Sequence, residues 1–182
     1  MSIPLLRFPP VSDRRSRSWF PGPPAGEPGC LVAMRQTVAT GAGIEISLVN
    51  VVAFSSGFAF DVEIQGDRTK ALDVHGLEYF EGGPVESVFR FGIEYEDGRR
   101  ATNLDRVAGT RRRGIGLVAY AMASRPGGST VSVWSWPLPP GRQIAFACDW
   151  IVLGIAFSRI ELDAAALRTA GTRSRRLVLG KG

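Results

Sequence analysis

The stretch VWSWPLPPGRQIAFACDW, residues 133–150, holds three of the four tryptophans of the chain and decides its fold. In its second half, large side chains occupy every other position, namely Ile144, Phe146, Cys148 and Trp150. Such alternation is typical of a β-strand with one buried face. Because a slip of one residue would expose all four side chains, the pattern predicts a strand over 143–150 with Trp150 in the core.

The first half of the stretch carries the other two tryptophans, Trp134 and Trp136, ahead of a Pro-Leu-Pro-Pro-Gly corner. Val131 and Val133 occupy one face of this segment and the two tryptophans the other, which predicts a strand that is apolar on both faces. Aromatic rings on an open sheet face can bind sugars, bases or proline-rich peptides, so an aromatic binding surface is one alternative. We favour packing, because a hairpin at the corner would bring the two rings against the apolar face of the next strand.

The same period of two marks the segments on either side. GIEISLVNVVAF (43–54) changes phase after Asn50, as a β-bulge would cause, and GFAFDVEIQG (57–66) alternates without a break. SVFRFGIEYEDGRRATN (87–103) contains the hairpin signal Asp97-Gly98, with a short return strand near Arg100 to Thr102. Further short strands are predicted from GLVAYAMAS (116–124), STVSVWSW (129–136) and AFSRIEL (156–162).

The ends of the chain differ from its middle. Residues 1–29 are dense in proline and glycine and predict an extended arm, with Trp19 and Phe20 as apolar anchors for partial docking. ELDAAALRTAGTR (161–173) predicts a helix with Asp163 as its cap and Gly171 as its stop.

These patterns predict an all-β protein. We expect an antiparallel β-sandwich of seven to nine strands, immunoglobulin-like or jelly-roll in plan, with a Pro-rich N-terminal arm and a short C-terminal helix. The expected divisions are an arm over 1–29, a β-sandwich domain over 30–162, and a short helix with a basic tail over 163–182.

Several of these motifs resemble those of a family of actinobacterial proteins of unknown function. The motifs are WPLPPGRQIAFACDW, SRIELDAAAL, SSGFAFDVEI and RFGIEYEDGRRATN, so the resemblance covers most of residues 30–170. The segment RRRGIGLVAYAMASRPGGST departs from the family, which has a glycine-rich, Trp-containing run there. The resemblance implies family membership and brings no chemistry with it.

The net charge of +5 is concentrated in three segments. Residues 1–29 carry +2, residues 98–113 carry +5 and residues 163–182 carry +4, so the rest of the chain carries −6. Such segments can attract phosphates or acidic partners. The candidate residues for an anionic partner are Arg99, Arg100, Arg106, Arg111, Arg112 and Arg113, with Arg173, Arg175 and Arg176 of the tail. The alternative is coding bias, because only Lys70 and Lys181 are lysines.

The sequence offers little for catalysis, metal binding or a cofactor, and we expect none of the three. His75 is the single histidine, and Cys30 and Cys148 stand in apolar settings that predict small buried side chains. The remaining enzymatic alternative is a carboxylate-dependent hydrolase. Asp61 and Glu63 share one strand face and Glu94 and Glu96 another, and the four would cluster if the two strands were neighbours.

The function that we expect from these observations is a non-enzymatic binding or assembly module. Its partner would be another protein or a second copy of the chain, and the alternative is a nucleic acid or other anionic polymer bound by the arginines. No apolar run is long enough to span a bilayer, and MSIPLLRFPP lacks the pattern of a signal peptide. We therefore expect a cytoplasmic protein without a membrane partner.

Overall fold

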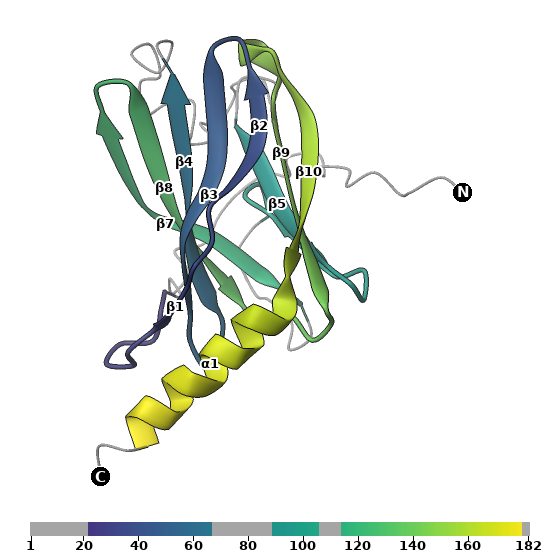
Figure 1. The fold of residues 1–182 in the computed structure, drawn as a ribbon. Coiled ribbons are helices and arrows are strands. Elements are labelled where there is room, and N and C mark those ends of the chain that lie inside the picture. Colours follow the sequence, from purple (N-terminus) through teal and green to yellow (C-terminus); the bar gives the residue numbers. More distant parts are fainter. Residues whose placement is uncertain (1–21, 67–88, 106–113, 180–182) are drawn as a thin grey trace.

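The computed structural model describes residues 22–66, 89–105 and 114–179. Within them lie ten strands, a 3-10 turn and one α-helix (Figure 1). The first six strands are β1 (Cys30–Val32), β2 (Gln36–Gly41), β3 (Ile44–Ala53), β4 (Phe58–Gly66), β5 (Arg90–Tyr95) and β6 (Arg100–Thr102). The others are β7 (Gly116–Arg125), β8 (Gly128–Trp136), β9 (Gln143–Trp150) and β10 (Ile155–Asp163), with the turn η4 (Ile151–Leu153) before β10 and the helix α1 (Ala164–Leu179) after it.

The strands form two antiparallel sheets that pack face to face as a sandwich. Sheet A has six strands in the order β1-β3-β4-β8-β7, with β2 paired to β3 beside β1. Sheet B has four strands in the order β10-β9-β5-β6. The predicted class, an all-β sandwich with a C-terminal helix, is confirmed. The described residues form ten strands, whereas the sequence predicts seven to nine. The difference arises because the short strands β1 and β2 lie before the first clear alternation.

The core lies between the sheets and is built by the alternating faces of the central strands. Phe60 of β4 and Phe146 of β9 meet edge to face across the two sheets, with ring centroids 5.8 Å apart. Trp150 is only 1% exposed and packs on Phe89 at 5.2 Å. The predicted burial of Ile144, Phe146, Cys148 and Trp150 is confirmed.

The predicted hairpin between β8 and β9 is wrong. β8 pairs with β4 and β7 in sheet A, whereas β9 pairs with β5 and β10 in sheet B. The Pro-Leu-Pro-Pro-Gly corner thus carries the chain from one layer to the other, which suits a segment whose prolines cannot donate ladder hydrogen bonds. As a result the inward side chains of β8 are Val131 and Val133, and the two tryptophans point to the outer face of sheet A.

The phase change in β3 is a bulge, as the sequence predicts. The register with β4 shifts between Val49 and Val52, and Asn50 has a positive φ of 51°. Its side-chain amide donates to Asp61 at 2.9 Å, so the residue that breaks the strand also binds the outer face of the neighbouring strand. Asparagine tolerates this left-handed conformation better than most residues.

The end of the arm docks on the sandwich. The carboxylate of Glu27 accepts hydrogen bonds from the backbone N–H of Ser55 at 2.6 Å and from the hydroxyl of Ser174 at 2.5 Å. Ser174 lies on α1 and Ser55 in the β3–β4 turn, so this carboxylate ties three distant parts of the chain together. The expected anchors Trp19 and Phe20 lie outside the described residues.

The helix begins where the sequence predicts and ends later. The carboxylate of Asp163 accepts from the backbone N–H of Ala165 at 2.7 Å, which confirms the cap. Gly171 is not the stop, because α1 continues to Leu179. A side chain at Gly171 would place its Cβ 2.7 Å from the carbonyl oxygen of Phe54 and 2.6 Å from Leu138, so this glycine permits close approach of the helix to the body.

We expect the substitution Gly171→Ala to destabilise the protein by about 1–3 kcal/mol, because the added methyl group collides with a backbone oxygen. In a free-standing helix the same change would stabilise by about 1 kcal/mol. Chemical denaturation followed by circular dichroism measures the difference, with the exposed neighbour Thr172→Ala as the control. A stabilised Gly171→Ala variant would show that the helix does not approach the body this closely.

Candidate functional site

Two of the candidate arginines of residues 98–113 are described, Arg99 and Arg100, and both have acidic neighbours. The candidates Arg173, Arg175 and Arg176 lie on α1 rather than in a tail. Arg99 forms an ion pair with Asp97 at 2.8 Å, and its guanidinium lies 5.5 Å from the ring centroid of Tyr95. Arg100 is exposed on β6, in register with Glu94 of β5. The remaining residues of that predicted cluster, Arg106, Arg111, Arg112 and Arg113, lie outside the described residues. The two described arginines alone do not form a cationic surface.

The four acids singled out from the sequence are not brought together. Asp61 and Glu63 lie on the outer face of β4 in sheet A, whereas Glu94 lies on β5 in sheet B and Glu96 follows directly after that strand. The two layers of the sandwich separate the pairs, so the condition for a four-carboxylate cluster is not met.

The sheet A carboxylates are instead bound by neighbouring side chains. Asp61 accepts a hydrogen bond from the hydroxyl of Ser132 at 2.7 Å, in addition to that from Asn50. Glu63 forms ion pairs with Arg125 at 2.6 Å and with Arg35 at 3.1 Å. These contacts hold the outer surface of sheet A together.

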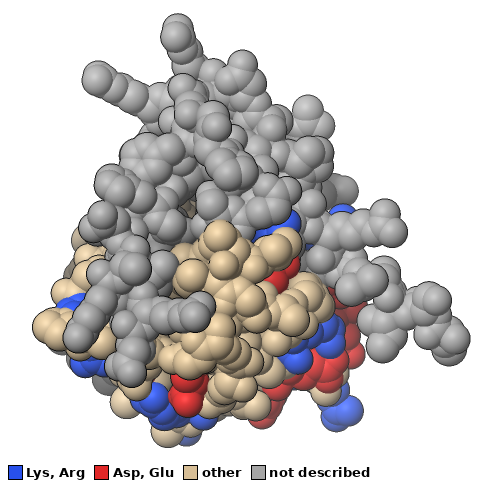
Figure 2. Space-filling view, turned by 90° about the horizontal axis from the view of Figure 1, so that it is seen from above, with Lys and Arg blue, Asp and Glu red and all other residues tan. Residues whose placement is uncertain are grey.

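The outer face of sheet B bears a polar hollow of about 190 Å³. Its floor is Ala145, which lies in register between Glu94 and Glu161. Figure 2 shows acidic side chains gathered with basic ones toward the right, the side on which β9 and β10 lie in Figure 1. Glu161 is paired with Arg159 at 2.8 Å. Within the three described ranges, no group of three or more His, Cys, Asp or Glu side chains is placed to hold a metal ion.

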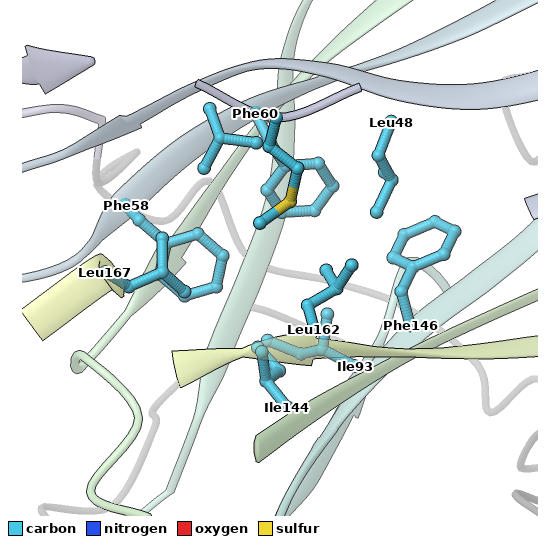
Figure 3. A pocket seen from close by; sticks show the side chains of 10 residues that line it. Leu48, Phe58, Phe60, Ile93, Ile144, Phe146, Leu162 and Leu167 are labelled. Atoms are coloured by element: carbon cyan, nitrogen blue, oxygen red, sulfur yellow. The ribbon is translucent and has the colours of Figure 1, made fainter. Parts of the chain in front are cut away.

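A second cavity lies inside the sandwich and is apolar. Figure 3 shows side chains of both sheets pointing toward one another around it, with Leu167 of α1 at its edge. Its volume is about 10 Å³, which is no more than one water molecule needs, and no polar atom lines it. It is a packing gap of the core rather than a ligand site.

The two cysteines are free thiols. Cys148 is buried, and burial raises the pKa of its thiol to about 12. Because the thiolate is the nucleophilic form, Cys148 is inert at neutral pH. Cys30, half-buried on β1, has no disulfide partner.

The two tryptophans of β8 cover one half of β7. Trp134 is 3% exposed and meets Phe54 edge to face at 5.6 Å, in a small apolar cluster with Val118 on the outer face of sheet A. Trp136 is half-buried and lies directly over Gly116, where an added Cβ would come within 2.0 Å of the indole. Trp134 therefore packs, as we favour from the sequence, and the pair does not form an open aromatic platform.

Beyond these tryptophans β7 is exposed. It pairs with β8 on one side, and no strand of the described residues pairs with its other side. Six of the seven residues from Ala119 to Arg125 are exposed, and only Met122 is half-buried. Tyr120 lies at a bulge in the pairing with β8 and is 40% exposed. The strand carries no charged residue before Arg125.

Edge strands are commonly kept short, bulged or guarded by charges. The open half of β7 is long and uncharged up to Ser124, and the bulge at Tyr120 is its one such feature. The other described edges follow that rule. β1 and β6 have three residues each, and β10 carries Arg159, Glu161 and Asp163 and packs against β2. Sequence reasoning finds β7 as a strand but not as an edge, because only the strand order shows which strands end a sheet.

No family model, curated protein or solved structure matches this chain. The class of the protein is therefore defined by its fold, an antiparallel β-sandwich in which β7 is a long edge strand of the described part, uncharged up to Ser124. Among the described residues, no helix has both the length and the apolar character that crossing a membrane requires.

Proposed function

We propose that the protein is a cytoplasmic, non-enzymatic binding or assembly module that adds a β-strand of a protein partner to β7. The observation that carries this proposal is the exposed, uncharged edge from Ala119 to Ser124. In an edge strand about half of the backbone N–H and C=O groups point away from the sheet, and an incoming strand can pair with them. Recognition of this kind depends mainly on the main chain.

The side chains of this edge support strand addition. Ala121 and Ala123 are small and lie on the same outer face as Tyr120, so a partner backbone can approach without steric conflict. Tyr120 offers an exposed ring beside that path, and such rings contribute strongly to binding energy at interfaces. The tryptophan cluster anchors the first residues of β7 to β8, and beyond the bulge at Tyr120 the strand pairs with β8 again as far as Arg125.

The anionic-polymer alternative has no comparable support from the described contacts, since Arg99 is already paired with Asp97. It makes an opposite prediction about salt. Binding through phosphate contacts weakens steeply as the salt concentration rises, whereas a hydrogen-bonded apolar strand pair does not.

We expect the double substitution Ala121→Lys with Ala123→Lys to abolish binding at the edge. Two lysines on an edge strand repel an incoming strand and keep the exposed edge hydrated. The full chain is isolated by affinity from cells that produce it naturally, and native mass spectrometry identifies any polypeptide retained. Retention should fall by about tenfold or more in the variant, equivalent to about 1.4 kcal/mol.

The matched control is Leu31→Lys, which adds a charge to an exposed residue of β1 at the other side of sheet A. This variant should retain the partner as the unmodified chain does. A chain that retains no polypeptide, or a double variant that retains its partner undiminished, would refute strand addition at β7.

A further inference from the structure

We propose that the strand added to β7 is β7 of a second copy of the chain, paired antiparallel about a two-fold axis near Ala121. This inference rests on the proposed function and specifies its partner. A two-fold interface uses the same patch on both subunits, so the patch must be complementary to itself. The edge of β7 meets that condition because it is uncharged up to Ser124, carries several small side chains and belongs to an antiparallel sheet.

The charge of the edge is compatible with self-pairing. Like charges directly opposite each other on paired strands are destabilising. From Gly116 to Ser124 the strand is uncharged, and its single charged residue, Arg125, stands at its end. A two-fold axis near Ala121 places the two Arg125 side chains at opposite ends of the interface. Each is also held by Glu63 of its own chain at 2.6 Å.

The size of the side chains also fits. Alanines occupy positions 119, 121 and 123 around the axis, so two backbones can reach the spacing of paired strands without a clash between large side chains. Sheet A is antiparallel throughout. Antiparallel pairing of two β7 strands would therefore join two six-stranded sheets into one continuous antiparallel sheet.

Single cysteines placed along the edge test this pairing. In the full chain with Cys30→Ser, the variants Ala119→Cys, Ala121→Cys and Ala123→Cys are oxidised separately with diamide. Residues next to a two-fold axis face their own copies at the distance that a disulfide needs. At least one of the three should form a disulfide-linked dimer about tenfold faster than the control Leu31→Cys, because pairing raises the effective thiol concentration.

Cys148 remains in every variant but is buried, and the variant with Cys30→Ser alone measures its contribution. Adding Ala123→Lys to Ala121→Cys should remove the rapid cross-link. The dimer should also persist as the salt concentration rises, unlike an assembly held by arginines and phosphates.

The outcomes separate the two proposals. If none of the three cysteines cross-links faster than Leu31→Cys, pairing with a second copy is wrong. Strand addition still stands in that case if the double lysine variant loses a different polypeptide in the isolation experiment. If the cross-links fail and the isolation experiment shows no retained polypeptide, both proposals are wrong.

Discussion

Replacing Trp150 by alanine is expected to lower the free energy of unfolding by about 3–5 kcal/mol. Among the residues that the structure describes, the indole is the largest fully buried side chain, at 1% exposure, and it packs on Phe89 between the two layers. Its removal takes away a large apolar surface and leaves a cavity that the rigid sheets cannot close. Because domains of this size are commonly stable by about 5–15 kcal/mol, the variant should be close to unfolding at ordinary temperature.

Urea denaturation followed by far-ultraviolet circular dichroism measures this loss without relying on the removed fluorophore. The matched control is Phe157→Ala on the adjacent strand β10, where the ring is 36% exposed. That variant should lose about 1 kcal/mol or less, since exposed surface positions contribute little. Equal losses in the two variants would show that Trp150 is not sealed between the sheets.

Replacing Arg90 by methionine is expected to destabilise the protein by about 3–5 kcal/mol, because it removes the guanidinium partner of a buried carboxylate. Arg90 donates two hydrogen bonds of 2.6 Å to the two carboxylate oxygens of Asp149. The side chains are only 17% and 7% exposed, respectively. This ion pair joins β5 to β9 on the outer face of sheet B, in register.

The double substitution Arg90→Met with Asp149→Leu should recover much of the loss, since two apolar side chains leave no buried charge behind. Arg159→Met removes the partner of an exposed ion pair with Glu161 on the same sheet and serves as the control. Its effect should stay below about 1 kcal/mol. The denaturation midpoints of the unmodified chain and the three variants measure these differences in stability. An Arg90→Met variant as stable as Arg159→Met would contradict a structural role for the ion pair of Arg90 and Asp149.

Sequence reasoning recovers the local structure of this fold well and its pairing poorly. The period of two identifies β4 and β9 because their large side chains alternate strictly with small or polar ones. This period does not determine which sheet a strand joins, and for that reason the predicted hairpin between β8 and β9 is wrong. The Pro-Leu-Pro-Pro-Gly corner has the length of a hairpin loop, but it connects two layers.

The role of a glycine and the exposure of a strand edge also depend on contacts that are remote in sequence. Gly171 has the residue type of a helix stop, yet its role depends on the backbone of Phe54, which is remote in sequence. The open edge of β7 also depends on remote pairing. The sequence GLVAYAMAS shows an uncharged strand, and only the strand order shows that nothing in the described part of sheet A pairs with its second side.

Amide hydrogen–deuterium exchange of the full chain at low and high protein concentration tests most directly whether β7 is a pairing edge. If the edge pairs with a second copy, peptides covering residues 119–125 should exchange more slowly at the higher concentration, because association protects their outward amides. Exchange in β1 should not change, and Ala121→Lys should abolish the concentration dependence. Exchange in β7 that is the same at both concentrations, or protection that persists with Ala121→Lys, would contradict pairing of the chain with itself through this edge.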